Sequence, residues 1–195
     1  MKDIVFATHN PNKLTEIRQM LPTGLQLVSL DDIGCREEIP ETDNTLEGNA
    51  RLKAVYVHKH YGYDCFADDT GLEVSALDGA PGVYSARFAG PGANSEANIQ
   101  KLLHLMEGQT NRRARFRTVI ALVLDGTFHF FEGEVAGEIL SQPTGTGGFG
   151  YDPVFRPAGY DISFAQMPLP EKNRISHRGK AFRNLNAFLR KNLGR

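Results

Sequence analysis

The chain of 195 residues has a formal net charge of −1, with 41% hydrophobic and 23% charged residues, which is typical of an ordinary globular domain. This balance gives no bulk attraction to nucleic acid or anionic membranes, and no apolar run is long enough to span a bilayer. The first apolar run is too short for a signal peptide, and Cys35 and Cys65 form no CxxC pair. We therefore expect a single cytoplasmic domain over residues 1–195.

The chain begins with an expected strand, a polar loop and a helix. Residues 3–7 predict a short buried strand, Asn10 suits the N-cap of the helix, and Pro11 suits its first turn. The apolar side of this helix is formed at helical spacing by Leu14, Ile17 and Leu21. A helix N-terminus attracts phosphate, and Lys13 adds a positive charge there. An ordinary capped helix with a solvated lysine gives the same pattern, and the P-loop motif is absent.

A second strand is expected over residues 25–30, followed by an acidic loop over residues 31–43. Asn44 and Glu47 then form a capping-box pattern, which predicts the start of a second helix. The buried stripe of this helix is expected to contain Leu46, Ala50, Ala54, Val57 and Tyr61. Lys53 lies one position off the stripe, near the edge of the buried face.

A predicted strand over residues 64–67 leads into the sequence Asp-Asp-Thr-Gly at residues 68–71. We expect a strand that ends there, with both carboxylates at its mouth, and a further short strand over residues 72–77. Paired carboxylates suit a divalent cation or a general base. The same residue types also favour turns, so this segment alone leaves a turn and a functional site as alternatives.

The second half of the chain contains a helix signal over residues 94–106 and the clearest strand signal over residues 113–124. The dipeptide at residues 125–126, Asp-Gly, predicts a tight hairpin. A returning strand is therefore expected over residues 127–134, with a third antiparallel strand over residues 135–141.

Three arginines, Arg113, Arg115 and Arg117, alternate along the strand at residues 113–124. Such a ridge is compatible with nucleic-acid binding. The one aromatic residue between them, Phe116, falls on the opposite face of the strand, and the chain has no net positive charge, so we favour a solvated strand face.

A glycine-rich segment follows, in which Gly145, Gly147 and Gly150 match the GxGxxG pattern. We reject a dinucleotide fold, because Pro153 and an extended apolar run follow where that fold needs a helix. We expect a loop that approaches a ligand closely and offers Phe149 as a stacking face. A flexible hairpin loop is the alternative.

The last segment predicts a helix with Ser176 as its N-cap, so that His177 and Arg178 occupy the first two helical positions. An arginine there opposes the helix dipole, and we expect it to have an anion or another acceptor as partner. His177 alone is also compatible with an ordinary surface histidine. Lys172 is expected in an exposed loop before this helix.

Together, five motifs resemble the inosine triphosphate pyrophosphatase family, and they appear in that family's order from the first strand to the last helix. They are Thr8-x-Asn10-x-x-Lys13, residues 67–72 (ADDTGL), residues 79–87 (GAPGVYSAR), residues 145–153 (GTGGFGYDP) and residues 176–179 (SHRG). Two positions depart from the common pattern. Thr70 stands where serine is common, and His9 stands where glycine is common in bacterial members.

The resemblance implies an elongated α/β fold, in which helices flank a central mixed β-sheet and an active-site cleft lies between two lobes. It implies a cytoplasmic homodimer that requires Mg²⁺ and does not bind nucleic acid or membranes. It implies hydrolysis of ITP, dITP and XTP to the nucleoside monophosphate and pyrophosphate, which removes these non-standard purine nucleotides from the pool.

The resemblance also implies residue roles, with Asp69 as the general base and with Glu41, Asp69 and Asp68 near the metal. The residues expected to meet the triphosphate are Thr8, His9, Asn10, Pro11, Asn12, Lys13, Lys53 and Lys172. Those expected to meet the nucleoside are Thr70, Phe149, Gly150, Tyr151, Asp152, His177 and Arg178. Donors of His177 or Arg178 would pair with a 6-oxo group and leave the 6-amino group of adenine unpaired, at a cost of about 1–3 kcal/mol.

Three other functions stay open at this point. One is a Maf-type pyrophosphatase for modified pyrimidine nucleotides, against which the Phe149 loop and residues 176–179 argue. Another is a non-catalytic nucleotide sensor, against which the aspartate pair argues. The third is a nucleic-acid binder that uses the three arginines.

Overall fold

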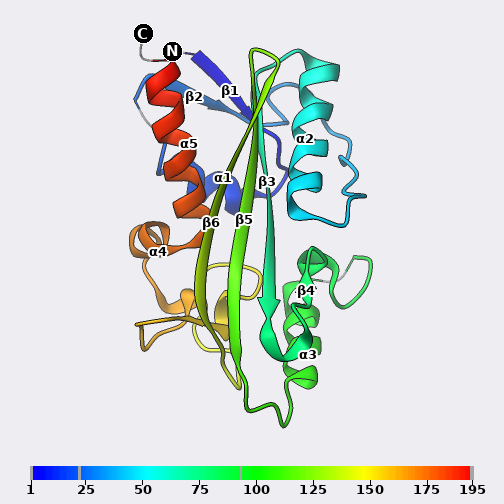
Figure 1. The fold of residues 1–195 in the computed structure, drawn as a ribbon, viewed down its shortest axis with the longest axis vertical. Helices are drawn as coiled ribbons and strands as arrows, with labels where there is room; N and C mark the ends of the chain where they lie inside the picture. Colours follow the sequence, from blue (N-terminus) through cyan, green and yellow to red (C-terminus); the bar gives the residue numbers. More distant parts are fainter. Residues whose placement is uncertain (1, 22, 93, 194–195) are drawn as a thin grey trace. The chain divides into compact units, whose positions relative to one another are not determined.

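Figure 1 shows the computed structural model, which describes residues 2–21, 23–92 and 94–193. Met1 and Arg195, the two ends of the expected domain, lie outside the described residues. The strands are β1 (Lys2–Phe6), β2 (Leu25–Val28), β3 (Cys65–Val74), β4 (Pro81–Gly82), β5 (Arg113–Leu124), β6 (Thr127–Ile139) and β7 (Phe155–Pro157). The α-helices are α1 (Pro11–Arg18), α2 (Leu46–Tyr61), α3 (Ser95–Leu105), α4 (Leu169–Ile175) and α5 (His177–Leu193).

The strands form one mixed sheet in the order β2-β1-β3-β5-β6-β7, with β4 paired to β3. β1 is parallel to both β2 and β3, whereas β4 and β7 run antiparallel to their neighbours. The expected α/β class with a mixed sheet is therefore confirmed. Within the described ranges, no helix combines the length and the apolar character that a membrane span requires.

Local signals placed several elements correctly. Asn10 caps α1, and its side chain accepts hydrogen bonds from the backbone N–H groups of Asn12 and Lys13. The turn between β5 and β6 consists of Asp125 and Gly126, both at positive φ, as a tight hairpin requires. The cap of α2 was predicted one residue early, because Thr45 and not Asn44 accepts the N-terminal hydrogen bond.

Three expectations about elements were wrong. β3 continues through residues 68–71 to Val74, so the aspartate pair lies within a strand and not at a strand end or turn. β6 runs unbroken to Ile139, through Gly133 and Gly137, and it replaces the two strands expected over residues 127–141. Lys172 lies on α4 and is buried, although we expected it in an exposed loop.

The chain folds into two compact units. The first comprises residues 1–69, 118–133 and 178–195, and the second comprises residues 70–117 and 134–177. The boundaries between them fall within β3, β5 and β6 and directly before Arg178. The single domain over residues 1–195 stays a prediction.

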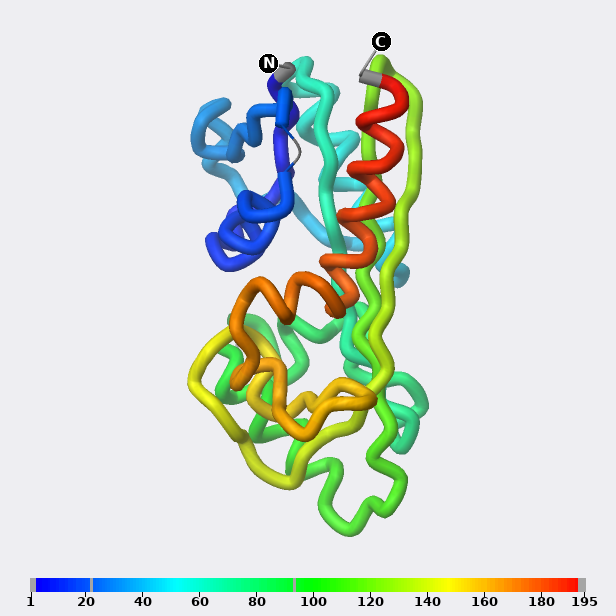
Figure 2. Tube along the Cα trace, turned by 90° about the vertical axis from the view of Figure 1, so that its left-hand side faces the viewer, coloured from blue at the N-terminus to red at the C-terminus, as the bar shows by residue number. Residues whose placement is uncertain are grey.

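In the first unit, helices cover both faces of the strands, and the alternation of side chains explains why. On one face, Phe6 and Phe66 pack against α1 and α5, whose core residues include Ile17 and Phe182. On the other face, apolar residues of β1, β3 and β5, together with Ala7 directly after β1, pack against α2. The strand residues are Val5, Cys65, Ala67, Ala121 and Val123. Figure 2 shows α5 running beside the hairpin end of β5 and β6, where Phe188 contacts Phe131.

The second unit has its own core, centred on aromatic residues. The rings of Phe116 on β5 and Phe155 on β7 meet edge to face, with centroids 4.7 Å apart. Phe164 packs on both rings, and Ile99 and Leu102 of α3 belong to the same buried cluster. This unit therefore buries apolar surface independently of the first.

The second unit also explains the glycine that follows the aspartate pair. A Cβ atom at Gly71 would lie 2.8 Å from the carbonyl oxygen of Gly82 on β4. We expect Gly71→Ala to lower the free energy of unfolding by about 1–3 kcal/mol, because the added methyl group must push β4 away. Urea unfolding of the variant and the wild type would measure this, and a loss below about 0.5 kcal/mol would show that β4 yields freely.

Candidate functional site

The predicted site residues divide between the two units. The first unit contains Thr8, His9, Asn10, Pro11, Asn12, Lys13, Glu41, Lys53, Asp68, Asp69 and Arg178. The second contains Thr70, Phe149, Gly150, Tyr151, Asp152, Lys172 and His177. Lys172 thus accompanies residues expected to meet the nucleoside, and Arg178 accompanies residues expected to meet the triphosphate.

The alternation of β3 separates Asp68 from Asp69. Asp68 shares its face of the strand with Phe66, which packs on Phe182 of α5, so Asp68 faces α1 and α5. Asp69 shares its face with Ala67, which packs with residues of α2. Two adjacent carboxylates of one strand therefore belong to different side-chain environments.

Asp68 is held by cations. Its Oδ1 accepts a hydrogen bond from Lys13 Nζ at 2.8 Å and its Oδ2 accepts one from Arg178 Nε at 3.1 Å. Only 1% of the residue is exposed, and burial alone would raise the pKa of its carboxyl group, but Lys13 and Arg178 hold this pKa below its usual range. Asp68 is therefore a permanent anion that orders two positive side chains.

Arg178 has a second carboxylate partner, because its Nη1 donates to Oε2 of Glu16 on α1 at 2.6 Å. Both side chains are buried, and the two carboxylates outweigh the effect of burial and raise the pKa of the guanidinium group. The expectation that an arginine at this helix start needs an acceptor is confirmed. The acceptors are Asp68 and Glu16 of the protein itself.

Asp69 has a different environment. Its Oδ2 accepts a hydrogen bond from Asn49 Nδ2 on α2 at 3.2 Å, and 7% of the residue is exposed. Burial raises the pKa of Asp69 to about 6, Lys53 opposes this shift, and the negative charge of Glu41 adds to it. A carboxyl group that titrates near neutral pH can accept a proton from water, which is what a general base does.

Lys53 links the acidic loop to β3. Its Nζ donates to Glu41 Oε1 and, at 2.7 Å, to the backbone carbonyl oxygen of Asp68. Burial alone would lower the pKa of Lys53, but the carboxylate of Glu41 raises it overall, so the ammonium group stays charged. The predicted position of Lys53 at the edge of the buried face of α2 is confirmed.

The loop before α1 is ordered by its own polar groups. Thr8 Oγ1 accepts a hydrogen bond from Asn10 N at 3.2 Å, and Asn10 caps the helix. The ring nitrogen Nε2 of His9 lies 3.0 Å from the carbonyl oxygen of Glu37. This is the predicted strand–loop–helix junction, and phosphate binding by it stays a prediction.

In the second unit, a buried lysine sits among aromatic rings. Lys172 Nζ donates to Asp152 Oδ2 at 2.6 Å and lies 4.9 Å from the centroid of the Phe149 ring. The same carboxylate oxygen accepts the backbone N–H of Phe149 at 2.8 Å. A Cβ atom at Gly148 would lie 2.1 Å from Asp152 Oδ2, so the glycine permits this approach.

His177 and Tyr151 complete this group. The ring of His177 stacks on Phe116 with centroids 4.6 Å apart, and Tyr151 donates its hydroxyl to the carbonyl oxygen of Ser85 at 2.8 Å. His177 is buried, which excludes the ordinary surface histidine. After the glycines, a short 3₁₀ turn (Asp152–Val154) leads into β7, so the rejection of a dinucleotide fold is confirmed.

Sequence reasoning assigned no role to Glu16 or Asn49. Neither residue belongs to a motif, and each acts through a partner that is distant along the chain. One observation pointed to Glu16. It lies next to the core residue Ile17 on a short helix, and the buried Arg178 requires an acidic partner. Another pointed to Asn49, because it lies one helical turn before Lys53 on the same face of α2.

The carboxylates suit a magnesium ion only in part. Across residues 2–21, 23–92 and 94–193, no group of three or more His, Cys, Asp or Glu side chains is arranged to hold a metal. Mg²⁺ commonly uses one or two carboxylates together with substrate phosphates and water. Glu41 and Asp69, which both interact with Lys53, match that smaller requirement.

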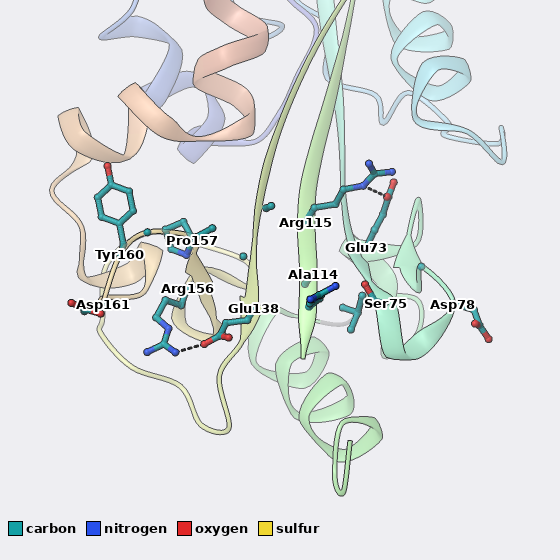
Figure 3. A pocket seen from close by; sticks show the side chains of 17 residues that line it. Glu73, Ser75, Asp78, Ala114, Arg115, Glu138, Arg156, Pro157, Tyr160 and Asp161 are labelled. Carbon is teal, nitrogen blue, oxygen red and sulfur yellow. Dashed lines mark hydrogen bonds and ion pairs between the residues drawn. The ribbon is translucent and has the colours of Figure 1, made fainter. Parts of the chain in front are cut away.

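One of the three alternating arginines, Arg115, pairs with two acidic side chains. Arg115 donates from Nε to Glu73 at 2.6 Å and from Nη1 to Glu134 at 3.0 Å, and Arg156 pairs with Glu138. Glu73, Arg115, Glu138 and Arg156 are among the residues that line a hollow of about 1060 Å³ in the second unit, which Figure 3 shows, and no predicted site residue lines it. The solvated strand face is thus the better interpretation of this ridge.

The comparisons with known proteins agree with these motifs. The model of the Ham1 family matches residues 4–188. A dITP/XTP pyrophosphatase of Christiangramia forsetii is 59% identical over 96% of this chain and 99% of its own length, and one of Porphyromonas gingivalis is 57% identical over 97% and 98%. The structure of the Staphylococcus aureus Ham1 protein matches with a TM-score of 0.89 at 40% identity, over 98% of this chain and all of that one.

Proposed function

Because the chain belongs to the Ham1 family, we propose that it hydrolyses dITP, ITP and XTP to the nucleoside monophosphate and pyrophosphate. The names of the two curated relatives support this activity. The main structural support for this activity is the difference between two adjacent aspartates of β3. Asp68 is a fixed anion, whereas Asp69 titrates near neutral pH.

In the reaction we propose, Asp69 accepts a proton from the attacking water. The oxygen of this water forms a new bond to one of the two phosphorus atoms that the α–β bridging oxygen joins. The bond from that phosphorus to the bridging oxygen breaks, and the nucleoside monophosphate and pyrophosphate separate. Lys13 and Lys53 supply positive charge for the phosphate oxygens, and the loop over residues 8–13 supplies a helix N-terminus. Asp68 keeps Lys13 and Arg178 in place.

We propose that Glu41 and Asp69 hold Mg²⁺, with Asp68 in support, because carboxylate oxygens are the ligands that this ion prefers. When bound, the ion would neutralise negative charge on the phosphate oxygens. Asp68 is less suited to direct ligation, because one of its oxygens binds Lys13 and the other binds Arg178.

We propose that the group in the second unit binds the purine. Phe149 offers a ring, Asp152 and Lys172 offer polar groups around it, and Thr70, Gly150, Tyr151 and His177 belong to the same unit. We also propose a cytoplasmic homodimer without nucleic-acid partners. The pairing of Arg115 with Glu73 and Glu134 supports the absence of nucleic-acid binding.

The purine site predicts the effect of removing its aromatic ring. We expect Phe149→Ala to raise KM for dITP by about 5- to 150-fold, the equivalent of the ~1–3 kcal/mol of one base–aromatic stack. Steady-state kinetics would measure this, with Phe130→Ala as the control, because Phe130 is an exposed phenylalanine of β6. Equal KM values for dITP in the two variants would show that the purine ring does not stack on Phe149.

The substrate class is tested by pyrophosphate release from dITP, ITP, XTP, GTP, ATP and a modified pyrimidine triphosphate, with Mg²⁺ and with EDTA. We expect kcat/KM for dITP and XTP to exceed that for ATP by at least about tenfold, the effect of one unpaired buried polar group, and we expect EDTA to abolish turnover. Equal turnover of ATP and ITP would contradict the proposed selectivity. Tight ITP binding without turnover would favour the nucleotide sensor.

A further inference from the structure

Glu37 lies at a junction of three segments of the first unit. Its Oε1 accepts hydrogen bonds from the hydroxyl groups of Tyr56 and Tyr61 on α2, both at 2.8 Å. Its Oε2 accepts the backbone N–H of Arg36 at 3.1 Å, and its carbonyl oxygen lies 3.0 Å from Nε2 of His9. One residue thus joins the acidic loop to α2 and to the loop before α1.

These hydrogen bonds also fix the charge of Glu37. Backbone N–H groups and the hydroxyls of Tyr61 and Tyr56 lower the pKa of its carboxyl group to about 2, although the side chain is exposed. An exposed glutamate on a loop is ordinarily solvated and mobile. Glu37 instead uses both carboxylate oxygens as acceptors from defined donors of the protein.

The position of Glu37 along the loop means that the segment carrying Glu41 is held at both ends. Glu41 lies between Glu37 and Asp43, and Asp43 is anchored in turn, because its backbone N–H donates to Asn49 Oδ1 at 2.9 Å. Asn49 also donates to Asp69. The segment that presents Glu41 to Lys53 is therefore tied to α2 at both ends, by the two tyrosines and by Asn49.

We propose that Glu37 is a positioning residue for hydrolysis, which keeps Glu41 against Lys53 and holds the acidic loop in register with His9. This inference rests on the proposed function, in which Glu41 serves the magnesium ion and residues 8–13 meet the triphosphate. In this role Glu37 itself contacts neither the magnesium ion nor the triphosphate. It acts by restricting the conformations of the acidic loop. Loosening the loop lowers the fraction of molecules in which Glu41 is in place, so more Mg²⁺ is needed.

The variant Tyr56→Phe/Tyr61→Phe tests this role, because it removes both hydroxyl donors and leaves the loop sequence unchanged. We expect trypsin to cut after Arg36 faster, and the Mg²⁺ concentration for half-maximal activity to rise, each by about tenfold or more, since both removed donors bind a charged group. We expect kcat at saturating Mg²⁺ to stay within about twofold. Tyr63→Phe is the matched control, because Tyr63 is an exposed tyrosine just beyond α2.

A second pair of variants distinguishes loss of the Glu37 carboxylate from the loss of any acidic residue in this loop. Glu37→Ala is expected to reproduce the rise in the Mg²⁺ requirement, whereas Glu38→Ala, at the adjacent exposed position, is expected to behave as the wild type. The single variants Tyr56→Phe and Tyr61→Phe serve if the double variant does not fold.

The outcomes distinguish this role from the proposed function. Unchanged cleavage after Arg36, or faster cleavage with an unchanged Mg²⁺ requirement, in an active enzyme would overturn the positioning role alone. Absence of pyrophosphate release from the wild type would overturn the proposed function, and this role with it.

Discussion

Replacing Asp69 by asparagine is expected to lower kcat for pyrophosphate release from dITP by about 10²- to 10⁴-fold, the usual contribution of a general base. Asparagine keeps the shape of the side chain and an oxygen that can accept from Asn49, so the fold should survive. It cannot accept a proton from water. The measurement is kcat at saturating dITP and Mg²⁺, and Asp161→Asn, an exposed aspartate, is the control.

The same variant has an expected effect on stability, and the sign is opposite to that on activity. The folded-state pKa of Asp69, about 6, is above the ordinary value of 3.8, so ionisation of this group disfavours the folded state as the pH rises through that interval. We expect Asp69→Asn to be more stable than the wild type at pH 7–8 in EDTA, by on the order of 1–3 kcal/mol, and equal to it below about pH 4. A difference that is independent of pH would contradict the raised pKa.

Replacing Asp68 by asparagine is expected to act on stability first. The change leaves the buried Lys13 and Arg178 without the carboxylate that compensates their charge, and breaking a buried ion pair in this way costs about 3–5 kcal/mol. Urea unfolding at pH 7 would measure this loss. Asp161→Asn, the exposed control, should change the free energy of unfolding by no more than about 0.5 kcal/mol.

The pH dependence of Asp68→Asn provides a second check. The folded-state pKa of Asp68 lies below its ordinary value of 3.8, so its contribution to stability is complete above about pH 4 and is lost as the pH falls below it. We expect the wild type to lose part of its stability in that acidic range and the variant to lack this component. A variant that stays within about 1 kcal/mol of the wild type at pH 7 would show that the two cations find other partners.

Elements with local signals were predictable from the sequence. Asn10 before Pro11 defined the start of α1, Asp125-Gly126 defined the hairpin, and Ser176 defined the start of α5. Each depends on residues within a few positions of one another. Turn propensity misled the prediction at residues 68–71, because β3 continues there as a strand between β1 and β5 and the side chain of Asp68 has buried partners.

The sequence motifs identified the residues of the site, but they did not reveal which of these residues bind one another. Asp68 binds Lys13, 55 residues away, and Arg178, 110 residues away, and no local pattern announces such contacts. Lys172 appeared solvated because its partner Asp152 is 20 residues distant. Glu37 was only one of several acidic residues in a loop, and its role depends on two tyrosines of α2.

The identity of the products from dITP tests the central claim most directly. Incubation of the wild type with dITP and Mg²⁺, followed by separation of nucleotides and phosphates, should give dIMP and pyrophosphate in equal amounts, with Asp69→Asn forming neither at a comparable rate. Formation of dIDP and orthophosphate, or wild-type turnover by Asp69→Asn, would contradict the account.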